Sequence, residues 1–168
     1  MLESHDYSGR RGVLVPLMPK VHALLTETAK KEPLAGIEPP INIILWRQEI
    51  YKLLVEIHRR WLMVMDGPAI AGLMFFYFDK NGDTYINELR IAWPYRHNNG
   101  VFPLLIDRFM KDPGVKNSKN VFAGPNVKKE ANQELLASVG FEAHFENGWE
   151  PLGNPTDAAG VLKLRYLR

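Results

Sequence analysis

Residues 84–110 hold the side chains and spacings that suggest binding chemistry. The alternating run Thr84–Ile91 predicts a strand, the turn 96–101 follows it, and an amphipathic helix is expected to begin near Phe102. A cationic, glycine-containing turn at a helix N-terminus can hold phosphate, because unpaired backbone N–H groups and the positive end of the helix dipole meet there. The first hypothesis is therefore a site for a phosphorylated ligand.

The residue types in this turn suit that role. Asn98, Asn99 and Gly100 tolerate unusual backbone angles and are expected to aim successive amides inward, while Arg96 adds positive charge. A solvated strand-to-helix loop would use the same residues. The turn taken alone does not decide between the two interpretations, so the rest of the chain has to.

The strand before the turn carries a candidate general base, Glu88. Alternation places Glu88 on the face of Ile86 and Arg90, opposite Tyr85, where it is expected to look into a cleft and to receive a proton through water. A structural ion pair with Arg90 explains the same residue equally well. Tyr85 and Tyr95 are candidate acids, although tyrosines beside strands more often pack with the hydroxyl in solvent.

Other kinds of site find little support in the sequence. Five histidines lack the helical spacing of a zinc hydrolase, and cysteine is absent, which excludes disulfides and thiolate ligands. Residues 79–90 imitate a calcium loop, but Thr84 replaces the required glycine and Arg90 the required bidentate carboxylate. A hairpin turn is the better interpretation, and no metal is expected.

Composition favours one domain over residues 1–168. The chain is 46% hydrophobic and 24% charged, which suits a globular core. The net charge of +2 comes from scattered basic residues, so nucleic acid is not expected as a partner. The apolar run Ala69–Phe78 is too short to span a bilayer, and no signal sequence is recognised at the N-terminus. We expect a soluble, cytoplasmic protein.

The elements that position the turn can be read from periodicity. Residues 12–17 are expected to form a first strand, and a helix then ends near Pro33. Residues 33–40 predict a packed loop beside the working site. A second helix presents one apolar face. Its apolar residues are Trp46, Ile50, Leu53, Leu54, Ile57 and Trp61.

The rest of the chain reads as hairpins and one crossover. Residues 62–65 pair with Ala69–Phe78 through Asp66 and Gly67, and the turn at Asn81 and Gly82 leads into Thr84–Ile91. After the helix at Phe102 come a strand at 120–123, a helix ending at Gly140, and strands at 141–145 and 161–167. The order β-α-α-β-β-β-α-β-α-β-β predicts an α/β (α+β) fold whose mixed, mostly antiparallel sheet has about seven strands and about four flanking helices.

This order, together with two local patterns, resembles the GNAT superfamily of acyl-CoA-dependent N-acyltransferases. Residues 89–96 resemble the family's Leu-x-Val-x-Pro-x-x-Arg pattern after its fourth strand, and residues 135–141 resemble the ending of its last helix. The family's pyrophosphate loop usually runs Arg or Gln, two residues, Gly, one residue, then Gly or Ala. Here Asn99 and Val101 stand at the last two defined places, and the glycine is Gly100.

The resemblance implies roles for particular residues. Backbone amides of the turn would bind the pyrophosphate of coenzyme A, and the backbone of Ile91 and Trp93 would bind its pantetheine arm. The turn residues in question are Arg96, His97, Asn98, Asn99, Gly100 and Val101. A family asparagine falls near Lys129, with Asn126 and Asn132 on either side. The family's tyrosine acid is replaced by Leu136.

The expected function is acetyl transfer from acetyl-CoA, or a related acyl-CoA, to the amine of a small molecule or peptide. The family resemblance implies direct attack of the amine, with Glu88 or a water as base and a backbone amide near Ile91 polarising the carbonyl. The leading alternative is a non-catalytic acyl-CoA sensor with the same fold. Calcium and nucleic-acid binding are weaker alternatives, a membrane partner is not expected, and a homodimer is left open.

Overall fold

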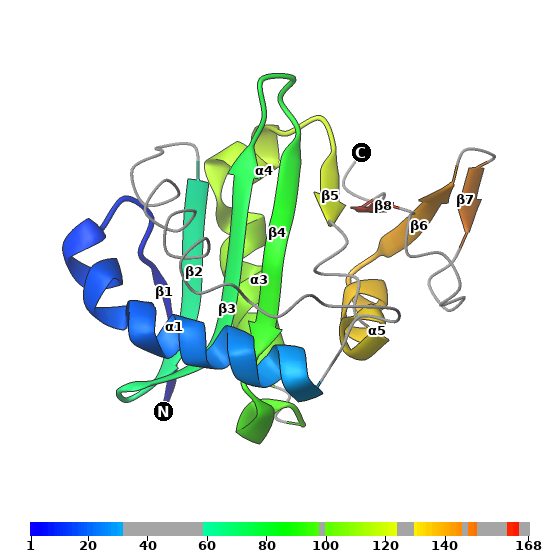
Figure 1. The fold of residues 1–168 in the computed structure, drawn as a ribbon. Coiled ribbons are helices and arrows are strands. Elements are labelled where there is room, and N and C mark those ends of the chain that lie inside the picture. Colours follow the sequence, from blue (N-terminus) through cyan, green and yellow to red (C-terminus); the bar gives the residue numbers. More distant parts are fainter. Residues whose placement is uncertain (32–58, 98–99, 124–129, 146–147, 151–160, 165–168) are drawn as a thin grey trace.

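An eight-stranded sheet carries helices on both of its faces (Figure 1). The computed structural model describes residues 1–31, 59–97, 100–123, 130–145, 148–150 and 161–164. The strands lie in the order β1-β2-β3-β4-β5-β8-β6-β7, and all neighbouring pairs are antiparallel except the parallel pair β4–β5. The mixed, mostly antiparallel sheet confirms the expected fold class, with eight strands in place of about seven.

The elements have the following bounds. The strands are β1 (Leu2–Asp6), β2 (Arg59–Asp66), β3 (Ala69–Phe78), β4 (Thr84–Ile91), β5 (Val121–Ala123), β6 (Phe141–Phe145), β7 (Gly148–Glu150) and β8 (Val161–Leu164). The helices are α1 (Arg11–Lys31), the 3-10 helix η1 (Trp93–Tyr95), α3 (Val101–Lys111), α4 (Pro113–Asn117) and α5 (Glu130–Ser138).

Helix α1 crosses one face of the sheet, which we call the α1 face (Figure 1). Its buried residues pack on alternate side chains of β2 and β3, among them Trp61, whose ring stacks on Phe75 with centroids 4.7 Å apart. The opposite face, the α3 face, packs Ile86, Leu89 and further apolar side chains against α3. Two apolar layers thus hold the sheet, as the alternation of the strands requires.

Residues 12–17 are helical, and the prediction of a first strand there was wrong. Pro16 and Pro19 lie inside α1, where each ring removes a backbone donor. Leu14, Val21 and Leu25 are nevertheless all buried at helical spacing. Burial of this face against the sheet outweighs the poor helix propensity of proline and of β-branched residues.

Three further boundaries differ from the sequence prediction. The true first strand is β1, which pairs antiparallel with β2. Trp61 belongs to β2 and not to the end of a helix. The other residues of that expected helix, like the expected loop 33–40, lie outside the described residues. The short strand β7 was not foreseen. Strand β8 is described over Val161–Leu164, within the expected 161–167, and the rest of that range lies outside the described residues.

The two predicted hairpins are confirmed. Strand β2 pairs with β3, and β3 with β4, and Gly82 in the second turn has φ +82°. The Asp79 carboxylate accepts hydrogen bonds from the backbone N–H of Asn81 at 2.8 Å and of Asp83 at 2.9 Å. These bonds lower the pKa of Asp79, the largest contribution coming from Asp83. Asp79, whose position in the sequence is similar to that of a calcium ligand, therefore stabilises the hairpin turn.

Gly72 on β3 lets α3 approach the sheet. A Cβ atom placed there would lie 2.5 Å from Cγ1 of Val101 and 3.1 Å from Cδ1 of Leu105. Gly72 pairs with Ile91, the last residue of β4. The missing side chain therefore seats the first turn of α3 beside the end of β4.

We expect Gly72→Ala to lower the free energy of unfolding by about 1–3 kcal/mol, because the added methyl overpacks the α3 interface. Urea denaturation would measure the loss. Gly12→Ala is the matched control, since a Cβ at Gly12 meets nothing within 4 Å and alanine favours the helix. Equal stability of the two variants would contradict the close approach.

Candidate active site

In the described part of the chain, strand β4 has an open edge beyond its last pair with β5. The parallel pairs are Thr84 with Val121, Tyr85 with Phe122 and Ile86 with Ala123, whereas β4 continues to Ile91. We call the β5-facing side of residues 87–91 the open edge. Among the described residues, no strand pairs with it.

Backbone groups of β4 point into this opening. The N–H of Ala92 donates to the carbonyl of Ala71 on β3 at 2.9 Å, so Ala92 faces β3. Successive residues of a strand face alternate neighbours. The N–H and C=O of Ile91 therefore face the open edge, on the side where the sequence analysis expected the pantetheine arm.

A β-bulge in β4 corrects the predicted faces of the strand. Phe75 pairs with Glu88 and Phe76 with Ile86, so Asn87 is an extra residue without a partner on β3. The bulge reverses the alternation, and Ile86 lies on the α3 face with Leu89. Glu88 therefore does not share a face with Ile86, as was predicted. It lies on the α1 face.

Glu88 and Arg90 form a nearly buried ion pair on the α1 face. The Nε of Arg90 donates to Oε2 of Glu88 at 2.9 Å, and the two side chains are 6% and 13% exposed. Arg90 also donates through Nη1 to the hydroxyl of Thr28 on α1 at 3.2 Å. That hydroxyl in turn donates to the Leu24 carbonyl at 2.8 Å. Glu88 is thus held in one orientation next to the bulge.

Tyr85 stands in a row of rings on the same face as Glu88. Its ring stacks between Tyr77, at a centroid distance of 5.4 Å, and Phe122, at 5.1 Å. Partial burial and the nearby carboxylates of Asp79 and Asp83 raise the pKa of Tyr85. The hydroxyl therefore stays protonated at neutral pH, as a proton donor would need.

Tyr95 has a different partner. Its hydroxyl donates to Oδ2 of Asp66 at 3.0 Å, which raises the pKa of Tyr95. The amino group of Met1 lies 3.1 Å from Oδ1 of the same carboxylate, and this amine is the main cause that lowers the pKa of Asp66. Tyr95 thus fastens η1 to the β2–β3 turn, and nothing in its contacts favours a role as acid.

The turn after β4 ends in the N-terminus of α3. Trp93 is 43% exposed and His97 is exposed, and Asn98 and Asn99 lie outside the described residues. Gly100 has ordinary right-handed angles, φ −89° and ψ −28°, so it does not use the unusual conformations that the sequence analysis allowed for. No side chain of the described residues caps the helix at Gly100, and the first amides of α3 point out of its end.

Arg96, in the turn before α3, contacts an asparagine of α5. Both its Nη1 and Nη2 donate to Oδ1 of Asn132 at 3.3 Å. Asn132, which is 1% exposed, donates in turn through Nδ2 to the carbonyl of Leu89 at 3.3 Å. An amide side chain from α5 therefore occupies one group of the open edge, and Arg96 holds that amide in place.

Among the described residues, Asn132 is the asparagine that α5 brings to the open edge. The sequence analysis left Asn126 and Asn132 open and singled out Lys129, which together with Asn126 lies outside the described residues. Asn132 lies one helical turn before the buried Leu136, so both residues are on the same face of α5, and this spacing can be read from the sequence. Leu136 itself is fully buried and has no proton to donate, so the place of the family's tyrosine acid is filled by core packing.

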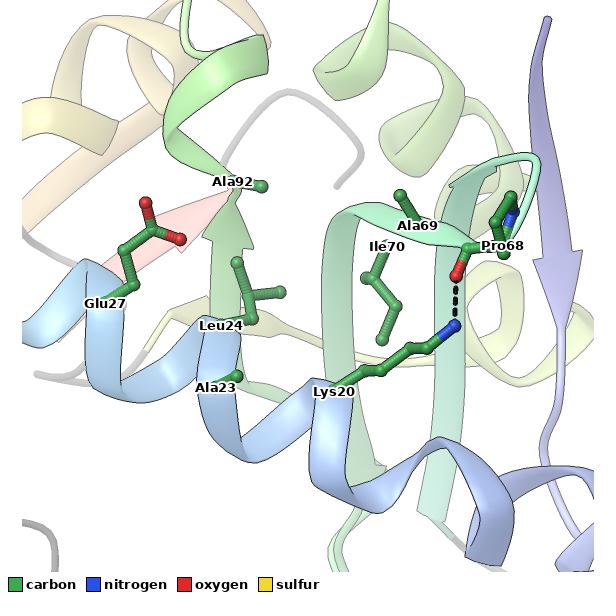
Figure 2. A pocket seen from close by; sticks show the side chains of 8 residues that line it. All are labelled: Lys20, Ala23, Leu24, Glu27, Pro68, Ala69, Ile70 and Ala92. Atoms are coloured by element: carbon green, nitrogen blue, oxygen red, sulfur yellow. Dashed lines mark hydrogen bonds between the residues drawn. The ribbon is translucent and has the colours of Figure 1, made fainter.

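A cavity of about 430 Å³ lies elsewhere on the α1 face, between α1 and the β2–β3 turn (Figure 2). Leu24, Ile70 and Ala92 line its apolar part, while Lys20 and Glu27 come from α1. Figure 2 shows Lys20 reaching across to donate to the Pro68 carbonyl. Of the described residues that line it, only Ala92, next to the end of β4, comes from the β4 segment.

Two negative observations hold for the described part of the chain. None of its helices combines the length and apolar character needed to cross a membrane. It also contains no group of three histidine, aspartate or glutamate side chains placed to hold a metal ion.

Comparisons with known proteins identify the fold. No protein-family model matches the sequence, and no curated protein matches it either. Solved structures do match. A GNAT-family acetyltransferase from Staphylococcus aureus Mu50 has a TM-score of 0.71 at 13% identity, over 97% of this chain and 98% of that one.

Two other solved structures are similar. The PaiA N-acetyltransferase of Thermoplasma acidophilum, in complex with coenzyme A, has a TM-score of 0.65 at 16% identity over 99% of both chains. An aminoglycoside acetyltransferase from an uncultured soil metagenomic sample, in complex with sisomicin, has a TM-score of 0.55 at 15% identity over 80% of this chain and 82% of that one. With its open β4 edge beside the α3 N-terminus, the chain has the fold of the GNAT acetyltransferases.

Proposed function

We propose that this protein is an acyl-CoA-dependent N-acyltransferase that moves an acetyl group from acetyl-CoA to an amine. The observation that carries the proposal is the edge of β4 that no described strand pairs with, which ends beside an N-terminus of α3 that no described side chain caps. An extended amide-bearing arm fits a strand edge, and a diphosphate fits a helix N-terminus. Coenzyme A joins these two groups in one molecule, and solved neighbours of the same fold carry it.

Both backbone groups and side chains are proposed to bind coenzyme A. Ile91 offers its N–H and C=O to the pantetheine arm, and the residues from His97 to Val101 offer amides to the pyrophosphate. Trp93 continues the edge beyond β4. Asn132 would exchange its bond to the Leu89 carbonyl for a bond to the arm, because both lie on the open edge. Lys129 is proposed to meet the phosphates from the start of α5.

The reaction is a direct transfer. The neutral amine attacks the thioester carbonyl carbon, a C–N bond forms, and the C–S bond breaks with its electron pair leaving on sulfur. A backbone N–H of the open edge, near Ile91, polarises the carbonyl oxygen. The proton from the amine goes to Glu88, directly or through a water, and the thiolate takes a proton from Tyr85 or from solvent. Arg90 keeps the Glu88 carboxylate oriented.

A non-catalytic acyl-CoA sensor is the second candidate, favoured by the buried Leu136 at the place of the family's acid. One experiment separates the two. Acetyl-CoA is expected to raise the melting temperature in either case, because it binds only the folded state. Release of free thiol with a panel of amines supports the enzyme, and binding without thiol release supports the sensor. Absence of any thermal shift would overturn both.

We expect His97→Glu to weaken coenzyme A binding by about 2- to 5-fold at low salt, because a negative charge beside the α3 N-terminus repels the diphosphate. His97→Gln is the neutral control. Isothermal titration calorimetry at two salt concentrations would measure both, and the difference should shrink at high salt. Equal affinities of the two variants at low salt would argue against the phosphate site.

We expect Glu88→Gln to lower kcat by about 100-fold or more while coenzyme A affinity stays the same, because the variant removes the base but no cofactor contact. The unpaired Arg90 is also expected to lower the melting temperature, so the assay is run well below it. Unchanged kcat would remove Glu88 from the mechanism and leave it the structural partner of Arg90.

A further inference from the structure

Four side chains form a continuous row across the α1 face beside Glu88. Arg59 of β2 lies over the ring of Tyr77 of β3 at 4.9 Å, and the rings of Tyr77, Tyr85 of β4 and Phe122 of β5 follow in steps of 5.4 and 5.1 Å. Adjacent rings are nearly parallel, at 12° and 29°. We call the three rings the ring row.

The ring row remains partly exposed. Tyr77, Tyr85 and Phe122 are all intermediate in burial, whereas Phe75, one step along the same face, is 4% exposed. On the α1 face, α1 crosses the other half of the sheet, and no described helix crosses this face where the row lies (Figure 1). The row therefore offers an apolar surface.

The orientation of the rings selects what can bind there. Side chains stand roughly perpendicular to a sheet, so near-parallel rings turn their faces to one another and their edges outward. Ring edges carry partial positive charge and ring faces partial negative charge. A flat aromatic group laid across the row would meet several edges with its face, which is the favourable T-shaped arrangement.

The distance between the ring row and Glu88 limits where the amine of a bound acceptor can lie. Glu88 pairs with Phe75, and Tyr85 pairs with Tyr77, two residues further along β3. Two residues of a strand span roughly 7 Å. An amine linked to an aromatic ring by two or three atoms would thus reach Glu88 while its ring rests on the row.

The local charges suit an amine. Asp79 and Asp83 act electrostatically on Tyr85 from one end of β4, and Glu88 lies at the other. Arg59 is held at the far end of the row, over Tyr77. The carboxylates thus lie on β4 and its turn, and Arg59 lies at the opposite end of the row, which favours approach of a cationic amine to the β4 side. The charge of Glu88 is shared with Arg90.

We propose that the ring row is the acceptor platform of the transferase and that the acceptor is an aromatic amine with a two- or three-atom linker. This inference rests on the proposed acyl transfer to an amine and names the substrate class. The row meets the open edge at its last pairs, because Tyr85 pairs with Phe122 immediately before Ile86 pairs with Ala123. The ring of the acceptor would lie at the start of the open edge, with its amine extended along β4 toward Glu88.

The test compares 2-phenylethylamine with 2-cyclohexylethylamine, which has the same linker and a similar ring without a π face. With acetyl-CoA and the full chain, kcat/KM is expected to favour the aromatic amine by about 2- to 12-fold, most of it in KM. Phe122→Leu and Tyr77→Leu should abolish this ratio without changing coenzyme A affinity. Tyr85→Phe keeps the ring and should keep the ratio, even if loss of the hydroxyl lowers kcat.

Calorimetric binding of the two amines to the coenzyme A complex gives a readout that does not need turnover. The same preference, lost in Phe122→Leu, supports the platform whether or not the protein is a catalyst. Equal binding and equal turnover of the two amines would overturn the platform. If acetyl-CoA produces no thermal shift, the transfer function itself fails, which is a different result.

Discussion

The edge of β4 beyond Ile86–Ala123, the last described pair between β4 and β5, is the constraint on which the rest of the site depends. A strand in the middle of a sheet normally satisfies its backbone groups on both sides. Here β4 runs five residues beyond its last described partner on β5, and the bulge at Asn87 directly follows that pair. Unpaired backbone groups on an interior strand need another partner, and a ligand with its own amides can supply one.

The surrounding elements keep this edge open and reachable. Gly72 brings α3 against the last pair of β4, so that the helix N-terminus and the strand edge share one place. Asn132 binds the Leu89 carbonyl from α5 and is itself held by Arg96. One group of the edge is thus satisfied by the protein's own side chain. The hydrogen bonds involved are 3.3 Å long, so an incoming amide can compete for them.

The α1 face carries the buried charges. Glu88, Arg90 and Thr28 link β4 to α1 through two hydrogen bonds in a place with little solvent. Such a pair gains little stability over apolar residues, but loss of one partner leaves a buried charge uncompensated. The ion pair therefore constrains both the orientation of Glu88 and the position of α1. The sequence supported two roles for Glu88 equally, a general base and a structural partner of Arg90. In this geometry the two roles are compatible.

Local patterns in the sequence were enough to predict much of the sheet. The hairpins at Gly67 and Gly82, the crossover through the helix at Phe102 and the stop at Gly140 follow from turn residues and periodicity, and the structure confirms them. The strand that bears Glu88 was also correctly predicted. In contrast, residues 12–17 were misassigned, because only packing on the sheet makes a helix with two internal prolines favourable.

Tertiary structure alone decided the site's geometry. The bulge at Asn87 leaves no mark in the composition of β4, yet it moves Ile86 to the face opposite Glu88. The hydrogen bond between Asn132 and the Leu89 carbonyl joins residues 43 positions apart, and the ring row joins β3, β4 and β5. The sequence by itself determined the elements, since turn chemistry and periodicity act between near neighbours. Only the folded chain decided which of their side chains meet, because those contacts depend on strand register and helix packing between distant segments.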